Sequence, residues 1–241
     1  MSPRLIVNYH HFTVDRRSNL HGALNYKFAD FECDLQKIAA WSRVHRTNEK
    51  QIQLTMDDGY HSQWIAAQQV LMPLEIKGLF FPILNRVGKS DFMNWSQLRD
   101  LSQQGHGIGV HGTTHCRLPF LDKQAFYKEI QFSKMTFEDR IGIEMKDFSL
   151  PYGVYTTAIV KQILEAGFKR VYTTRSLFNQ NTTSPLVHRF NVLHSTDVNN
   201  LLSALEREQY VLLKRAIPSM IANGLNYLHS LSNLKKVANN Q

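Results

Sequence analysis

Short apolar runs alternate along the chain with longer stretches in which apolar residues recur every three or four positions. The first pattern is typical of buried strands and the second of helices with one apolar face. It predicts strands at residues 5–9, 51–56, 78–83, 108–110, 148–150, 170–173 and 189–193. It predicts helices at residues 31–45, 62–71, 95–104, 123–140, 157–166, 198–215 and 218–231. Strands that alternate with helices of this length pair in parallel through right-handed crossovers. We therefore expect an α/β fold, a distorted or incomplete (β/α) barrel of about seven parallel strands.

The length of the chain fits this architecture. Closed α/β barrels often take roughly 200–250 residues as one domain. The chain has 241 residues, of which 43% are hydrophobic, and can therefore build a substantial core. We expect residues 1–241 to form a single catalytic domain, with residues 198–241 as its C-terminal helices.

Residues that carry chemistry lie at or just after the ends of the predicted strands. In barrels of this kind active sites form at the carboxyl ends of the strands. The residues at these positions are His10, Asp57, Asp58, His111, His115, Pro151 and His194. Their shared position is the strongest indication of function that the residues give by themselves.

Two of these histidines are spaced for binding one cation. His111 ends a short buried strand, and His115 follows four residues later, with only small or hydroxyl residues between them. The adjacent carboxylates of Asp57 and Asp58, at another strand end, are the obvious source of a harder third ligand. Three protein ligands would leave a position open for water or substrate, as in catalytic zinc sites. The pattern indicates a metal-dependent hydrolase site.

The charge of the chain is positive but dispersed. The formal net charge is +8, and the basic residues form only short clusters. A solvated surface is the simpler interpretation, and an anionic substrate, a nucleic acid or a membrane face is the functional one. We expect no nucleic-acid partner. The oligomeric state stays open.

The compartment is suggested by what the sequence contains. Two cysteines, Cys33 and Cys116, make no disulfide framework, which favours a reducing compartment. The sequence begins without a leader pattern and has no apolar run long enough for a membrane span. We therefore expect a cytoplasmic protein, or a secreted or periplasmic one if a leader has been removed.

Three ordered motifs resemble those of the polysaccharide deacetylase family, carbohydrate esterase family 4. Residues 55–60, Thr-Met-Asp-Asp-Gly-Tyr, resemble its Thr-Phe-Asp-Asp-Gly motif. Residues 105–115 resemble its Gly-His-Glu-Ile-Gly-x-His-x-x-x-His motif, and residues 150–153, Leu-Pro-Tyr-Gly, its Pro-Tyr-Gly motif. The resemblance spans roughly residues 5–195. Each motif alone is weak, but the ordered trio is specific.

The resemblance implies hydrolysis of an acetamide on a sugar by an Asp-His-His metal site. Asp58, His111 and His115 would bind a divalent metal, with zinc the default and cobalt, nickel or manganese as alternatives. Asp57 would be the general base, and the backbone N–H of Tyr152 would help to hold the oxyanion. The partner implied is an acetylated carbohydrate, in a polysaccharide or its precursor.

The chain departs from the family pattern at several positions. Residues 147–150 lack the arginine that orients the base in some members, and Arg189 could replace it from a late strand. The general acid has only a loose counterpart in His194, with His188 as a competitor. These departures resemble a subgroup with a Pro-Tyr-Gly motif that lacks the arginine. The residues expected to line the substrate site are His10, Tyr60, Pro151 and Arg189.

Two other functions are compatible with the same residues. The site could serve a cytoplasmic amidase that acts on a nucleotide-linked, lipid-linked or small-molecule amide. Alternatively, the chain could be a non-catalytic domain that binds glycan or nucleic acid and has lost turnover. The missing arginine and the unassigned general acid favour this last alternative.

Overall fold

The computed structural model describes residues 4–13, 24–44, 51–177, 179, 183–193 and 196–207. The chain divides into two compact units, Met1–Ser195 and Thr196–Gln241. In the second unit the described element is helix α7, Val198–Arg207. The expected helix at residues 198–215 is thus described as far as Arg207, and the one at residues 218–231 lies outside the described residues.

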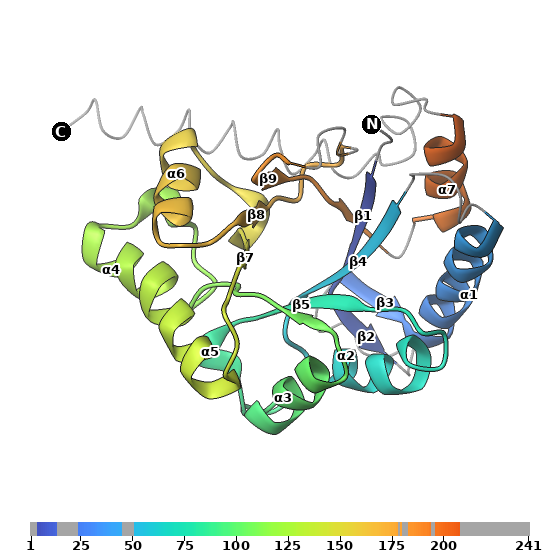
Figure 1. Cartoon of the computed structure of the whole chain (residues 1–241), viewed down its shortest axis with the longest axis horizontal. Helices are drawn as coiled ribbons and strands as arrows, with labels where there is room; N and C mark the ends of the chain where they lie inside the picture. The colour runs from blue at the N-terminus through green and yellow to red at the C-terminus, as the bar shows by residue number, and fades with distance from the viewer. Residues whose placement is uncertain are drawn as a thin grey trace. The chain divides into compact units, whose positions relative to one another are not determined.

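The first unit is built on parallel strands (Figure 1). One sheet of five strands has the order β10-β1-β4-β5-β6, and a sheet of three has the order β7-β8-β9. Their bounds are β1 Arg4–Tyr9, β4 Gln51–Asp58, β5 Gly78–Pro82, β6 Gly107–Ile108, β7 Asp147–Ser149, β8 Arg170–Tyr172, β9 Leu186–Val187 and β10 Phe190–Asn191. The expected α/β fold of parallel strands is confirmed.

Two junctions between these sheets explain why the barrel is incomplete. On one side, a single parallel bridge between Val110 and Phe148 joins the five-stranded sheet to β7. On the other side, β9 pairs with β8 and β10 pairs with β1. His188 and Arg189 lie between these two strands and belong to neither. The strand expected at residues 189–193 is thus present as the shorter β10, and β9, which precedes it, was not expected. Strand pairing does not close into one continuous sheet.

Helices follow the strands and lie outside them (Figure 1). Their bounds are α1 Phe28–Val44, α2 His61–Ala66, α3 Trp95–Gln103, α4 Lys123–Tyr127, α5 Ser133–Ile141 and α6 Thr157–Glu165. Two π-helical segments, η2 Ala67–Leu71 and η5 Lys128–Phe132, extend α2 and join α4 to α5. Each expected helix between residues 31 and 166 is present. Within the described residues, none of the helices has the length and apolar character to cross a membrane.

A small parallel sheet was not expected from the sequence. It pairs β2, His11–Thr13, with β3, Asn25–Lys27. Strands of three residues are too short to show an alternating pattern. The pair nevertheless covers one edge of the barrel, because Phe12 and Tyr26 are buried against Tyr9.

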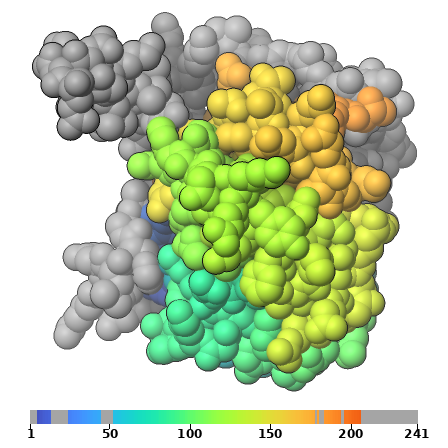
Figure 2. Space-filling model, turned by 90° about the vertical axis from the view of Figure 1, so that its left-hand side faces the viewer, coloured from blue at the N-terminus to red at the C-terminus, as the bar shows by residue number. Residues whose placement is uncertain are grey.

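The outer surface carries a groove beside the carboxyl ends of the strands. A cavity of about 450 Å³ is lined by residues from two segments, 118–126 and 156–162. These segments, green and yellow in Figure 2, adjoin on the face that the figure shows. The 3-10 turn η4, Leu118–Phe120, and the first turns of α4 and α6 form its walls.

Gly109 marks the point where β6 passes from one sheet to the other. Its N–H donates to the carbonyl of Phe80, and the next N–H, of Val110, donates to that of Asp147. A Cβ at Gly109 would lie 2.8 Å from the Asp147 carbonyl oxygen and closer still to the Phe81 ring. The crossing between the sheets therefore requires glycine.

We expect Gly109→Ala to lower the free energy of unfolding by about 1–3 kcal/mol, as overpacking of a filled core does. Urea denaturation of the wild type and the variant measures this difference, provided that the free energy of unfolding depends on urea concentration with the same slope in both. Gly142→Asn is the control: Gly142 has φ 82° and open space around its Cα, which asparagine tolerates. The control should stay within about 0.5 kcal/mol. If the wild type and both variants were equally stable, the strands around Gly109 would be able to move apart and accept a methyl group without loss of stability.

Candidate metal centre and active site

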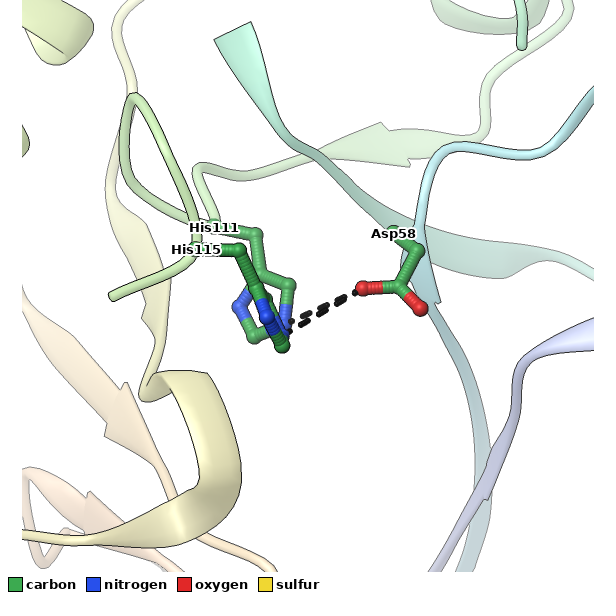
Figure 3. Close-up of side chains that lie close together, drawn as sticks. All are labelled: Asp58, His111 and His115. Carbon is green, nitrogen blue, oxygen red and sulfur yellow. Dashed lines mark ion pairs between the residues drawn. The ribbon is translucent and has the colours of Figure 1, made fainter. Parts of the chain in front are cut away.

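Asp58, His111 and His115 converge at the carboxyl ends of β4 and β6 (Figure 3). Their ligand atoms all lie within 4.8 Å of one another. Asp58 Oδ1 is 3.7 Å from His111 Nε2 and 3.5 Å from His115 Nε2. Ligands on a tetrahedral zinc ion, with bonds of about 2.1 Å, lie roughly 3.4 Å apart. The three side chains therefore have a separation that one cation can bridge.

The backbone is held in unusual conformations around this cluster. Asp58, His115 and Tyr152 have φ angles of 75°, 64° and 59°, in the left-handed region that residues with a Cβ rarely adopt. Such strain persists where the surrounding structure enforces it, and it gathers at functional sites. At Asp58 it turns the last residue of β4 out of the strand conformation.

Two of the candidate ligands, His111 and Asp58, present atoms with free lone pairs to a cation. His111 Nδ1 lies 2.8 Å from the carbonyl oxygen of Ser149. A carbonyl can only accept, so Nδ1 carries the proton and Nε2 presents its lone pair to the cluster. Asp58 Oδ1 is buried and has no hydrogen-bond partner among the described residues. A buried carboxylate oxygen without a partner is costly unless a cation completes it.

Glu129 holds the loop between the two histidines. This buried residue of η5 accepts from the N–H of Thr113 at 2.7 Å, and from the N–H and hydroxyl of Thr114 at 3.0 and 2.7 Å. The loop also needs a glycine, because a Cβ at Gly112 would lie 2.6 Å from Glu129 Oε2. The Glu129 carboxylate thus fixes the conformation of the loop that carries the two histidines.

Asp57 lies next to this cluster but is bound by a different set of groups. Both of its oxygens accept from Arg189, at 2.8 Å each, and Oδ2 also accepts from Asn8 and Ser149 at 3.1 Å. Arg189 is fully buried. It also donates to Ser149, Asn8, Thr55 and the carbonyl of Thr173. Asp57 Oδ2 remains only 3.9 Å from His111 Nε2, so the fixed carboxylate faces the cluster.

The electrostatics of the site favour an ionised Asp57 and a neutral His115. Burial alone raises the pKa of Asp57, but the charges of Arg189 and His111 and the hydrogen bonds from Arg189 outweigh it, so the pKa is lowered. Burial, and then the charges of His111 and Arg86, lower the pKa of His115 to about 4. A neutral imidazole is the form that binds metals.

The remaining predicted residues lie around this centre in different environments. His10 is buried, its pKa is lowered mainly by burial, and its Nδ1 lacks a partner among the described residues. Tyr60 is buried between the rings of Phe92 and His11, which leaves little of its ring for a sugar. Tyr152, in contrast, is 53% exposed.

The Pro-Tyr-Gly segment forms the 3-10 turn η6, Pro151–Gly153. Pro151 is buried beneath the turn. The exposed ring of Tyr152 lies 4.5 Å from the ring of His115, between their centroids. Gly153 has φ 66° and passes so close to Thr174 that a Cβ could not be accommodated. The turn thereby brings the ring of Tyr152 against His115, a member of the cluster.

Of the two candidates for the general acid, only His188 is described. Its Nδ1 lies 3.1 Å from the Thr173 hydroxyl, and burial followed by the charge of Arg175 lowers its pKa. His194 lies outside the described residues.

Three contributors to the site were missed in the sequence: Asn8, Ser149 and Glu129. Asn8 and Ser149 are ordinary polar residues in short strands, and nothing near them in the sequence indicates that they meet Asp57. Glu129 did leave a signal. It occupies the same helical face as the buried residues Ile130, Ser133 and Phe137, where a charge needs partners.

The fold and the site define a class of protein, an incomplete parallel (β/α) barrel with a candidate Asp-His-His metal centre and a second aspartate beside it. More particularly, the chain belongs to the polysaccharide deacetylase family. The model of that family matches residues 45–171, more than half of the chain, and the matched segment contains Asp57, Asp58, His111 and His115. The family expected from the motifs is confirmed.

Individual relatives agree with this assignment. YxkH of Bacillus subtilis (strain 168), whose name places it among the polysaccharide deacetylases, is 27% identical over 129 residues. The match covers 54% of this chain and 46% of YxkH, so the chain spans about half the length of this relative.

Two solved structures share the fold. The deacetylase PplD of Streptococcus pyogenes, in complex with acetate, superposes with a TM-score of 0.74 at 18% identity, covering 84% of this chain and 98% of PplD. IcaB from Ammonifex degensii superposes with a TM-score of 0.71 at 20% identity, covering 86% of this chain and 98% of IcaB. At these identities the similarity concerns the fold alone.

We expect Asp58→Ala and His111→Ala each to weaken divalent metal binding by more than about 100-fold, because each removes a candidate ligand. Titration calorimetry with Zn²⁺ measures the affinity. Asp139→Ala, which removes an exposed aspartate on α5, is the control and should bind as tightly as the wild type. Wild-type affinity in the Asp58 and His111 variants would refute the ligand assignment.

Glu129→Gln should weaken metal binding by about 10–100-fold, the usual effect of losing a group that orients ligands. The amide keeps the shape but loses the charge that four loop contacts share. The same titration reports the affinity, with exposed Glu144→Gln as the control. An unchanged affinity in a folded Glu129→Gln protein would show that the loop needs no such anchor.

Proposed function

We propose that this protein is a metal-dependent hydrolase that removes an N-acetyl group from an acetamido sugar in a polysaccharide or its precursor. One observation carries the proposal: an Asp-His-His group with the separation of metal ligands lies beside a second aspartate that is held by other groups. Membership of the polysaccharide deacetylase family supports the substrate class.

Asp58, His111 and His115 are the proposed ligands. Zinc is the proposed ion, because the two imidazoles and one carboxylate suit it, and cobalt, nickel or manganese could replace it. A divalent ion at this position would polarise the amide carbonyl and lower the pKa of a bound water.

Asp57 is the proposed general base. A general base must accept a proton from water and must not itself bind the cation. The bidentate contact with Arg189 occupies the carboxylate of Asp57, whereas Asp58 is left to bind the ion. Oδ1 accepts one hydrogen bond and Oδ2 accepts three, and Oδ2 is the oxygen that lies 3.9 Å from His111 Nε2, toward the proposed metal site. Asp57 remains ionised because Arg189 and His111 lower its pKa.

Arg189 is the proposed positioning residue for this base. From the sequence, two roles were expected for Arg189: lining the substrate site and replacing the arginine that orients the base. Because its guanidinium is fully buried and donates to five other residues, we assign it to Asp57 instead of to the sugar. It takes the place of the arginine that residues 147–150 lack.

Tyr152 has two proposed contacts with the substrate. Its backbone N–H is the proposed donor to the oxyanion that forms when water attacks the amide. Its exposed ring, beside His115, offers a surface on which a sugar can stack. His194 is the proposed acid that protonates the leaving amine, with His188 as the alternative, and His10 is the proposed residue of the pocket floor.

Asp57→Asn should retain metal binding and lose about 10²–10⁴-fold in kcat, the range for removal of a general base. Acetate release from chito-oligosaccharides by zinc-loaded protein measures kcat, and calorimetry measures metal affinity. Asp139→Asn is the matched control. Full activity of Asp57→Asn would refute the role of the base, and loss of metal by it would make Asp57 a ligand.

Arg189→Met should lower kcat at unchanged KM, because it frees the base to rotate without touching the sugar. Removing one partner of a buried ion pair also costs about 3–5 kcal/mol of stability. Arg189→Lys keeps the charge and should therefore restore part of kcat. Steady-state kinetics and thermal unfolding of both variants separate the two effects. An increase in KM with constant kcat would instead assign Arg189 to the substrate.

A further inference from the structure

Two arginines lie beside the candidate metal centre, and neither belongs to its hydrogen-bond network. Arg86 ends the 3-10 turn η3, Leu84–Arg86, which follows β5. Arg117 follows His115 by two residues. They approach the centre from two different loops.

Arg86 is fixed next to the loop that carries the histidines. The N–H groups of Leu84 and Asn85 donate to the carbonyls of Gly112 and Thr113, both at 3.0 Å. The guanidinium of Arg86 lies 5.1 Å from the centre of the Phe92 ring. Its charge acts on His115, whose pKa it helps to lower after burial and His111.

Arg117 is fixed on the opposite aromatic residue of the site. Its guanidinium carbon lies 4.7 Å from the centre of the Tyr152 ring, and this ring lies 4.5 Å from that of His115. Arg117 is exposed to solvent. When the face of a guanidinium packs on an aromatic ring, the N–H groups in the plane of the guanidinium remain able to donate to a ligand.

Neither arginine has a carboxylate partner among the residues that the structure describes. Within the described ranges, Arg170 and Arg189 form ion pairs with carboxylates, whereas Arg86 and Arg117 form none. At the centre itself, Asp57 and Arg189 cancel each other. A divalent ion on Asp58 would leave one positive charge, and the two arginines add two more. Such a concentration of one sign attracts anionic ligands.

Each arginine also adjoins space in which a ligand could extend. The ring of Phe92, on which Arg86 rests, lines a cavity of about 500 Å³ whose charged lining residues are Lys89 and Asp91. The groove of about 450 Å³ is lined by Leu118, the residue after Arg117. A neutral acetamido sugar has no group that requires two guanidinium ions.

We propose that Arg86 and Arg117 bind an anionic group, a phosphate or a carboxylate, that the substrate carries near its acetamido sugar. The substrate class is then an acidic acetylated carbohydrate. This inference rests on the proposed hydrolase function for the identity of the sugar, but the recognition of the anion can be tested separately.

The test compares three ligands that share an N-acetylglucosamine unit. UDP-N-acetylglucosamine carries phosphate, a hyaluronan tetrasaccharide carries carboxylate, and chitotetraose is neutral. Acetate release and equilibrium binding are measured on zinc-loaded wild type, Arg86→Gln and Arg117→Gln. Arg140→Gln is the matched control, because Arg140 also rests on an aromatic ring, that of Trp95 at 5.9 Å, but belongs to α5.

We expect the wild type to bind at least one of the anionic ligands more tightly than chitotetraose, with a preference that falls at high salt. Arg86→Gln and Arg117→Gln should each weaken that binding about tenfold, the effect of losing a hydrogen bond to a charged group. Binding of chitotetraose, and all binding by Arg140→Gln, should change less than about twofold. The anionic ligand that responds identifies phosphate or carboxylate as the group recognised.

Equal binding of the three ligands by the wild type would overturn the inference. So would an equal loss for neutral and anionic ligands in the arginine variants, which would indicate a general role in the site. Absence of acetate release from every ligand would refute the proposed hydrolase function. The binding measurements would still decide the role of the arginines.

Discussion

Arg189 donates to both carboxylate oxygens of Asp57 in the interior of the barrel, where neither residue is more than 1% exposed. A pair so buried is stable only when its remaining donors and acceptors are satisfied. Asn8 and Ser149 meet this condition from two further strands. Strands far apart in the chain are therefore tied to one point, and the split between β9 and β10 is the place where Arg189 enters the interior.

The consequence for the site is that two neighbouring aspartates differ in their environment. Asp57 is surrounded by donors. Asp58, with its backbone in the left-handed region, turns toward two histidines an oxygen that has no hydrogen-bond partner among the described residues. Adjacent residues on a strand point to opposite faces, and the twist at Asp58 changes that relation at the strand end. One carboxylate is thereby suited to a cation and the other to a proton.

Rigidity on the histidine side comes from different groups. Ser149 fixes the ring of His111 through its carbonyl, and its hydroxyl contacts Asp57, so one strand residue serves both halves of the site. Glu129 fixes the loop before His115 from a π-helical segment, a distortion that is frequent at functional sites. Small changes in either residue would be transmitted to the ligand geometry.

The sequence by itself determined the strand and helix pattern, the barrel class and the family, because periodicity and ordered motifs are local properties of the chain. It also singled out Asp58, His111 and His115, which the folded chain brings together. It did not determine the small β2–β3 sheet, the short strand β9, or the contacts of Asp57 with Asn8 and Ser149. It offered Arg189 only as a possible replacement for the missing arginine, since the contact with Asp57 joins residues separated by 132 positions. Only the tertiary structure decides such contacts, because burial and hydrogen bonding depend on which strands become neighbours in space.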